Sequence, residues 1–293
     1  MNQELLKYLC CPKCKTNLVG GGDFLVCSKC NQSYKTVDDV VILVDLDNLP
    51  DHLQKQIVYF TNESDCRLEY QLVAWQKSYL EKFIRNSGEI KNKLVVDCGT
   101  GSGYLAIELA KLGAEVIATD LTLKNLLELQ RAAKQLKLED KITLVCCDAQ
   151  ELPFSNNLAD YFISNAVLEH LPREQQAIDE INRVCKTDSV LMVTVPLSYK
   201  YLNPLFILLN YIHDKRIGHL RRYNKKILAN KFNNWSLVSS YYTGHFGKTI
   251  KLLANILVPW FNQEAIEKSD AGKENKKWGA INIICFFQKN NKI

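Results

Sequence analysis

The strongest indication of the fold is the segment Leu94-Val95-Val96-Asp97-Cys98-Gly99-Thr100-Gly101-Ser102-Gly103. Its apolar start predicts a short buried strand, and its alternating glycines predict a sharp turn into a helix. Glycine lets the backbone approach a ligand where a side chain would collide, and the helix N-terminus offers free amides. The segment therefore predicts a nucleotide-type binding turn.

The residues around these glycines indicate which nucleotide binds. A dinucleotide site has Gly-x-Gly-x-x-Gly, but Tyr104 stands where the third glycine is expected. Asp97 would repel a pyrophosphate but could help to hold a cationic amino group. No Gly-Lys-Ser/Thr ending follows, which excludes a P-loop. The turn therefore favours S-adenosylmethionine, which carries an ammonium group and a sulfonium.

Strands and helices alternate on both sides of the turn. Helical patterns near 103–111, 123–136 and 173–184 separate short apolar runs, which predict strands at 94–97, 115–120, 142–147, 161–164 and 190–195. Further strands are predicted near 235–242 and at 281–288. Such alternation predicts an α/β fold with a parallel sheet covered by helices on both faces.

Two acids stand at the ends of predicted strands. Asp120 ends the second strand, where it could accept hydrogen bonds from both hydroxyls of a ribose. Asp148 closes the third strand, where it could accept from an adenine amino group. Each acid alone could simply cap the next helix. Their order after one glycine-rich turn favours the nucleotide interpretation.

Residues 66–293 resemble the class I S-adenosylmethionine-dependent methyltransferases. The motifs that carry the resemblance are 97–103, Asp120, 148–154 and 165–171. The resemblance implies a seven-stranded Rossmann-like sheet whose last strand, 281–288, is antiparallel. It also implies the cofactor contacts: the methionine moiety at Asp97, Gly99, Gly101 and Gly103, the ribose at Asp120, the adenine at Asp148 with the backbone of Ala149, and the region of the methyl group at Asn165.

The first 45 residues contain two Cys-x-x-Cys pairs, Cys11 with Cys14 and Cys27 with Cys30. Four thiolates complete a tetrahedral Zn²⁺ site with no open position, so the expected metal is structural. Buried free thiols are the alternative, and Cys10 is an ambiguous neighbour. The segment resembles a short zinc-ribbon family that includes a small activating partner of tRNA and protein methyltransferases. That resemblance implies a folding or partner-binding module.

These patterns predict three parts: a zinc ribbon at 1–45, a linker at 46–65 and a methyltransferase domain at 66–293. The domain is expected to carry substrate insertions at 196–224 and 243–279.

The candidate general bases are His219, in a Gly-His-x-Arg-x-aromatic segment, and His170, with His245 a weaker candidate. Nearby arginines could hold an anionic group of the substrate.

Composition and charge bear on the partners. The chain has 293 residues, 47% of them hydrophobic, and a net charge of +5. Eleven cysteines without a recognisable secretory signal favour metal binding over disulfides, and a cytoplasmic location is expected. Residues 186–293 hold 17 of the 37 basic residues but 6 of the 32 acidic ones.

Three functions are open. The first is methyl transfer to a small-molecule, lipid or lipid-linked acceptor. The apolar patches at 201–212 and 250–261 are by default core-facing or lid helices; if exposed, they could accommodate an apolar acceptor or make a peripheral membrane contact. The second is methylation of RNA or of a translation protein, although basic residues are not interleaved with a stacking aromatic platform, which makes nucleic acid the weaker choice. The third is a noncatalytic binding protein whose ribbon docks a partner protein.

Overall fold

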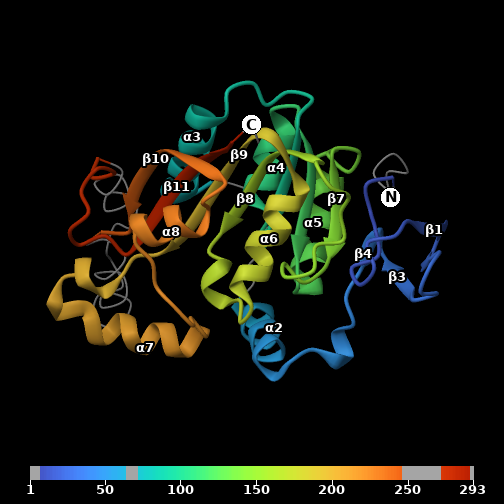
Figure 1. Ribbon diagram of the computed structural model, residues 1–293, viewed down its shortest axis with the longest axis horizontal. Helices are drawn as coiled ribbons and strands as arrows, with labels where there is room; N and C mark the ends of the chain where they lie inside the picture. The colour runs from blue at the N-terminus through green and yellow to red at the C-terminus, as the bar shows by residue number, and fades with distance from the viewer. Residues whose placement is uncertain (1–6, 64–71, 246–271, 291–293) are drawn as a thin grey trace.

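The protein folds around one long mixed sheet with helices on both faces (Figure 1). The computed structural model describes residues 7–63, 72–245 and 272–290. The strand order is β1-β2-β3-β4-β7-β6-β5-β8-β9-β11-β10. The predicted α/β class is confirmed.

The middle of the sheet follows the apolar runs of the sequence. Its parallel strands are β5 (Leu94–Cys98), β6 (Glu115–Asp120), β7 (Ile142–Cys146), β8 (Ala159–Asn165) and β9 (Cys185–Pro196). β11 (Asn282–Lys289) runs antiparallel to both of its neighbours, β9 and β10 (Trp235–Thr243). The last strand of the chain therefore lies inside the sheet, between β9 and β10.

The expected number of seven strands is wrong, because the described residues form an eleven-stranded sheet. The four additional strands are β1 (Leu18–Gly21), β2 (Phe24–Cys27), β3 (Ser33–Val37) and β4 (Val40–Ile42). The first three pair in sequence as an antiparallel meander, and β4 pairs with β3. β4 then lies parallel to β7, with Val41 opposite Val145 and Ile42 opposite Cys146. The cysteine-rich segment is thereby continuous with the main sheet.

Two apolar cores lie on opposite faces of the sheet. One core packs α3 (Ala74–Ser87), α4 (Tyr104–Lys111) and α5 (Leu123–Gln135) against residues such as Val95 and Val116. The other packs α6 (Glu174–Val184) and α8 (Lys225–Lys231) against residues such as Val96 and Phe162. This second core also includes Leu9, Leu25 and Tyr34, so the N-terminal segment shares its interior with the rest of the molecule.

The segments outside the alternating pattern gather at one end of the molecule. Residues 46–65, the predicted linker, contain the 3-10 helix η1 (Leu46–Asn48) and helix α2 (Asp51–Glu63). The expected insertion at 196–224 contains η3 (Tyr199–Tyr201), η4 (Pro204–Phe206) and α7 (Ile207–Ile217). Figure 1 shows α2 and α7 at the same lower edge of the molecule. Most of the expected insertion at 243–279, namely residues 246–271 with the apolar patch at 250–261, lies outside the described residues.

Within the described part of the chain, no helix has both the length and the apolar character needed to cross a membrane.

Candidate functional site

The glycine turn joins the carboxyl end of β5 to α4. Gly99, Gly101 and Gly103 all have positive φ angles, of 70°, 55° and 73°. A Cβ at Gly99 would lie 2.4 Å from Val167, and one at Gly103 would lie 2.4 Å from Leu129. At Gly101 a Cβ would meet no described atom within 4 Å. Gly99 and Gly103 therefore allow close packing of the protein itself, whereas Gly101 borders open space.

Asp97 and Asp120 lie beside this turn, at the ends of β5 and β6. Thr100 donates its hydroxyl to Asp97 Oδ2 at 2.6 Å. Asp120 accepts the backbone N–H of Gly101 at 2.9 Å and that of Thr122 at 2.7 Å. The turn and the second acid are thus bound directly to each other.

Burial perturbs both acids. It raises the pKa of Asp97 to about 6, with the neighbouring Asp120 adding to the rise and the Thr100 hydrogen bond opposing it. Burial also raises the pKa of Asp120, against the stabilising backbone N–H groups of Thr122 and Gly101. Two carboxylates close together in a buried site favour a cationic ligand.

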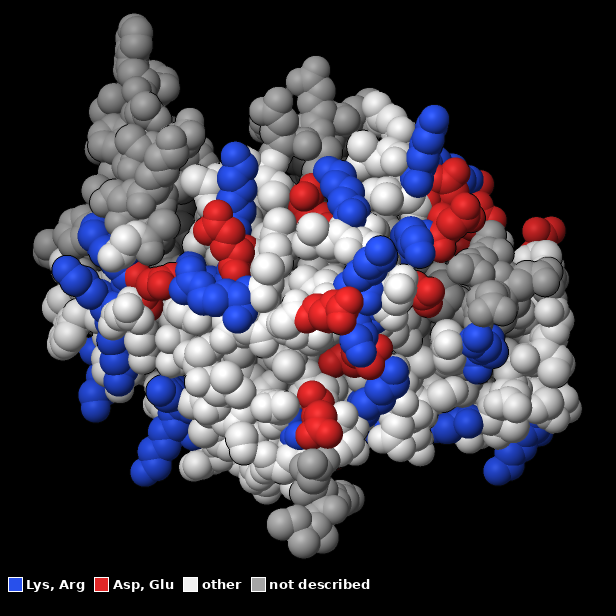
Figure 2. Space-filling view, turned by 90° about the horizontal axis from the view of Figure 1, so that it is seen from above, with Lys and Arg blue, Asp and Glu red and all other residues white. Residues whose placement is uncertain are grey.

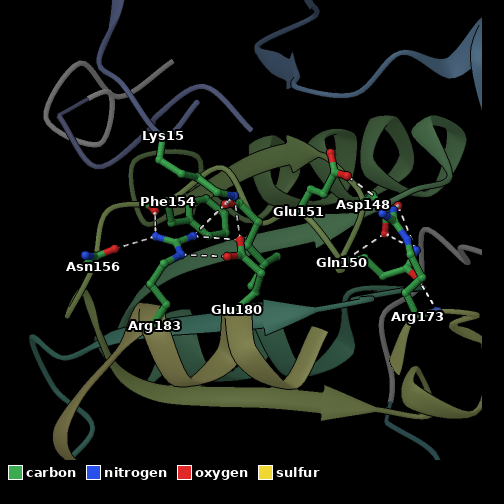
Figure 3. Close-up of polar contacts among 10 residues, drawn as sticks. Lys15, Asp148, Gln150, Glu151, Phe154, Asn156, Arg173, Glu180 and Arg183 are labelled. Atoms are coloured by element: carbon green, nitrogen blue, oxygen red, sulfur yellow. Dashed lines mark hydrogen bonds and ion pairs between the residues drawn. The ribbon is translucent and has the colours of Figure 1, made fainter. Parts of the chain in front are cut away.

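Asp148 follows β7 and is held by Gln150 (Figure 3). The Gln150 side-chain amide donates to both carboxylate oxygens, at 3.0 and 2.9 Å, and its backbone N–H donates at 2.8 Å. Gln150 Oε1 accepts the backbone N–H of Arg173 at 2.7 Å. Asp148 therefore has a fixed orientation, next to the half-buried Ala149.

Asn165 ends β8, the strand next to β5. Its side-chain amide donates to the hydroxyl of Tyr104 at 3.3 Å, and Tyr104 is the first residue of α4 after the glycine turn. The structure thus places Asp97, Asp120, Asp148 and Asn165 at the carboxyl ends of β5 to β8, the edge at which open α/β sheets bind ligands.

The two main candidate histidines lie together. The rings of His170 and His219 are 4.8 Å apart between centroids. His219 Nδ1 lies 2.9 Å from Asp214 Oδ1, and His219 Nε2 lies 3.7 Å from Glu169 Oε1. Arg222 forms a bidentate contact with the same Asp214, at 2.5 and 2.8 Å. His219 is therefore oriented by a carboxylate that an arginine holds in place.

His170 has a different environment. Burial, with the charges of His219 and His52 adding to its effect, lowers the pKa of His170 to about 3. His170 is therefore neutral at neutral pH. His245, the weaker candidate, contacts the carbonyl oxygen of Lys276 at 2.5 Å and is not part of the cluster around Glu169 among the described residues.

The four predicted metal-ligating cysteines come together. The sulfurs of Cys11, Cys14, Cys27 and Cys30 all lie within 4.8 Å of one another. Cys11 and Cys30 are 3.7 Å apart and Cys14 and Cys27 are 3.4 Å apart. Tetrahedral Zn–S bonds of about 2.3 Å would place the sulfurs about 3.8 Å apart. The arrangement therefore fits a four-coordinate zinc ion.

The cysteine-rich segment contacts the loop that follows Asp148. Lys15, next to Cys14, donates to the carbonyl oxygen of Leu152 at 2.9 Å and forms an ion pair with Glu180 of α6 at 2.7 Å (Figure 3). Arg183 binds the same carboxylate of Glu180 and donates to the carbonyl oxygens of Leu152 and Phe154 (Figure 3). One network therefore connects the metal-site candidate to the loop after Asp148.

Sequence reasoning missed several residues at this edge. Two residues of helix α2 contact this edge of the sheet. His52 Nε2 lies 2.8 Å from the carbonyl oxygen of His170, and Gln56 donates to the carbonyl oxygen of Ile217 at 3.0 Å. Asp214 was also missed, although it lies five positions before His219. The close spacing of an acid and a histidine was the available signal.

The strand order and the acidic edge define a methyltransferase-type fold, and a family model supports that class. The model is described as a methyltransferase domain and matches residues 96–193. The match runs from the end of β5 to β9 and includes every predicted cofactor residue.

Individual proteins are similar over the same region. The chain is 34% identical over 92 residues to the biotin biosynthesis bifunctional protein BioHC of Cellvibrio japonicus, covering 31% of this chain and 17% of that protein. It is 30% identical over 101 residues to the ubiquinone/menaquinone biosynthesis C-methyltransferase UbiE of Rickettsia prowazekii, covering 32% and 41%. The chain thus matches less than half of the length of these curated relatives.

Solved structures share the fold over more of the chain. The geranyl diphosphate C-methyltransferase of Streptomyces coelicolor A3(2), in a complex with Mg²⁺, geranyl diphosphate and S-adenosyl-L-homocysteine, superposes with a TM-score of 0.61. The superposition covers 83% of this chain and 98% of that one, at 12% sequence identity. This similarity establishes the fold.

Proposed function

We propose that this protein is an S-adenosylmethionine-dependent methyltransferase that acts on a small-molecule acceptor. The observation that carries the proposal is the pairing of the glycine turn with Asp120, beside the open space at Gly101. Asp120 would bind the ribose hydroxyls and Asp97 the ammonium group, while Asp148 and Ala149 would contact the adenine. Gly99, Gly101 and Gly103 would shape the turn around the methionine moiety, and Asn165 would lie near the methyl group.

The bound cofactor would supply a methyl group activated on a sulfonium. The protein's part is to orient the acceptor, exclude water and, where the acceptor is protonated, accept a proton. His219 is the proposed proton acceptor, because Asp214 fixes its Nδ1 and leaves Nε2 facing away from that carboxylate. His170 is the second proposed histidine, in ring contact with His219.

We further propose that the acceptor is apolar, with a lipid or lipid-linked molecule included. Helix α7 exposes Ile207, Leu208, Tyr211 and Ile212, beside Lys215 and Arg216. Such a surface suits an apolar acceptor with an anionic group, or a peripheral membrane contact. Two similar proteins are named for geranyl diphosphate and for ubiquinone/menaquinone biosynthesis, which supports an apolar small molecule.

Two alternative functions, methylation of RNA or a translation protein and a noncatalytic binding role, are distinguished by the experiment described below. On the face that Figure 2 shows, lysines and arginines are interspersed with acids, an arrangement that gives no support to an RNA-binding band on that face. A noncatalytic protein would dock its partner on the part of the ribbon that β4 does not use to pair with β7, where β1 ends the sheet and Val19 and Phe24 are exposed. We also propose a structural zinc ion bound by Cys11, Cys14, Cys27 and Cys30. A cytoplasmic location is part of the same proposal.

The test is incubation with methyl-labelled cofactor and a cell extract separated into lipid, small-molecule, RNA and protein fractions. We expect label in the lipid or small-molecule fraction. Label in RNA or protein alone would replace the proposed acceptor class, and label in no fraction would favour the binding role. Asp120→Ala is expected to weaken cofactor binding by about 1–3 kcal/mol, because two charged hydrogen bonds are lost. Unchanged calorimetric affinity would contradict the ribose contact.

A further inference from the structure

Glu169, His170 and His219 form a compact group of metal-ligand side chains, separate from the four cysteines. Glu169 and His170 lie in η2 (Leu168–His170), and His219 follows the end of α7. One donor atom from each of the three residues lies within 4.8 Å of the other two. All three are largely withdrawn from solvent, with Glu169 only 1% exposed and His170 7% exposed.

The contact of His219 with Asp214 leaves its other ring nitrogen, Nε2, facing Glu169. Asp214 is a carboxylate, so Nδ1 of His219 donates to it across 2.9 Å. In the neutral imidazole, Nε2 then carries the lone pair, and it lies 3.7 Å from Glu169 Oε1. A nitrogen lone pair and a carboxylate oxygen that face each other cannot hydrogen-bond to each other, but a cation between them can bind both. Asp214 would act as the carboxylate that commonly orients a metal-binding histidine.

The surroundings of His170 favour a metal ion over a shared proton between His219 and Glu169. His170 Nδ1 is buried and makes no hydrogen bond with any of the described residues. A proton shared by His219 and Glu169 would leave that nitrogen unsatisfied. A metal ion can engage both imidazoles and the carboxylate together.

We propose that Glu169, His170 and His219 bind one divalent first-row transition-metal ion. Two imidazoles and one carboxylate suit zinc, iron, cobalt, nickel or manganese better than magnesium or calcium, which prefer all-oxygen sites. Bonds of about 2.1 Å place neighbouring donor atoms roughly 3.0–3.6 Å apart, so the 3.7 Å between His219 and Glu169 requires little adjustment. Three protein ligands leave positions open for water or an oxygen of a bound molecule.

This metal site does not depend on methyl transfer. It does exclude one role of His219, because Nε2 cannot bind an ion and accept a proton at the same time. In the metal-bound protein, water or an oxygen bound to the ion would replace His219 in any proton transfer.

The test is equilibrium dialysis of the full-length protein against a Co²⁺ solution of fixed free concentration, with cobalt per chain and the visible spectrum as readouts. Wild type is expected to bind one more Co²⁺ per chain than Glu169→Gln or His219→Ala, with at least a tenfold loss of affinity in each variant. The wild-type-minus-variant spectrum is expected to lack a thiolate-to-cobalt charge-transfer band, which separates this ion from one at the cysteines.

His213→Ala is the matched control. His213 is exposed on α7, and its ring lies 6.5 Å from that of His219, so its loss should leave the cobalt count unchanged. Thermal unfolding checks that each variant is folded. Glu169→Gln keeps the shape of the side chain, so it still tests the proposal if His219→Ala does not fold. Equal cobalt counts in wild type and folded Glu169→Gln would overturn the proposal. Cobalt binding without any cofactor binding would instead contradict the proposed methyl transfer alone.

Discussion

Gly101 and Gly103 share a left-handed backbone conformation, but different atoms surround them. Both have positive φ, so alanine costs about 1–2 kcal/mol of strain at either position. Gly103→Ala also drives a Cβ into Leu129, whereas Gly101→Ala places its Cβ in open space. We expect Gly103→Ala to lower the free energy of unfolding more, and Gly101→Ala to lower cofactor affinity more, as measured by denaturation and calorimetry. Equal effects on both quantities would show that the open space at Gly101 is not the cofactor site.

Asp97 is expected to make cofactor binding depend on pH. Its pKa is about 6 in the free protein because the carboxyl group is buried. A bound ammonium group favours the carboxylate and lowers this pKa, so binding near pH 6 should release protons. Affinity should therefore rise between about pH 5 and pH 7 and then level off.

Calorimetry in buffers with different ionisation enthalpies measures this proton release. Asp97→Asn is the control, because an amide has no proton to release in this range. Binding enthalpies that do not depend on the buffer in wild type would show that Asp97 does not face the ammonium group.

Helix α2 is the element that connects the histidine cluster to α7. A Cβ at Gly218, which ends α7 with a φ of 76°, would lie 2.0 Å from Gln56 Nε2. Gly279 has a similar φ of 81°, but no described atom lies within 4 Å of a Cβ built there. Both alanine variants carry comparable backbone strain. Gly218→Ala should cost about 1 kcal/mol more, because it displaces the hydrogen bond from Gln56 to Ile217.

Chemical denaturation measures that difference, and hydrogen exchange of α2 locates it. Faster exchange in α2 for Gly218→Ala alone is the expected pattern. Equal stability of the two variants would mean that α2 does not restrain the end of α7.

The elements that the sequence predicts well are those with local signals. β6 begins and ends where its apolar run does, at Glu115 and Asp120, and α5 and α6 lie within a residue of their predicted bounds. β9 begins five residues earlier than predicted, at Cys185, because it continues through the polar residues 186–189, which no apolar run reveals. Helix α2 lies in a segment assigned to a linker. Its stability comes from contacts with residues more than a hundred positions away, such as His170 and Ile217.

In the candidate site, too, residues with local sequence signals could be predicted and residues that depend on long-range contacts could not. Asp97, Asp120 and Asp148 could be located because the carboxyl ends of parallel strands share one edge of the sheet. The contact between Asp214 and His219 depends on the turn at Gly218, and local sequence patterns do not determine its geometry.

At the scale of the whole molecule, the ribbon and the sheet are expected to unfold together. They share a core that includes Leu9, Leu25 and Phe162, and they share a strand pairing between β4 and β7. Removal of the proposed zinc ion by a chelator, or loss of one of its proposed ligands by Cys30→Ser, should therefore lower the Tm of the single main transition, by roughly 2–4 °C for each kcal/mol lost.

Lys29→Ala, an exposed change between the same two cysteines, is the control and should leave the Tm unchanged. The Tm is read by scanning calorimetry. A separate early transition, with the main one unmoved, would show that the ribbon folds independently. The sequence could predict the two parts but not this coupling, because the pairing of β4 with β7 joins residues about a hundred positions apart.

The position of β4 has a consequence for solubility. It covers one side of β7, a strand whose five residues are all buried. Without the first 45 residues, β7 would present a row of unpaired backbone N–H and C=O groups along an apolar edge, which is a template for pairing with another chain. A shortened protein that begins after β4 is therefore expected to aggregate, even though every proposed cofactor contact remains in it.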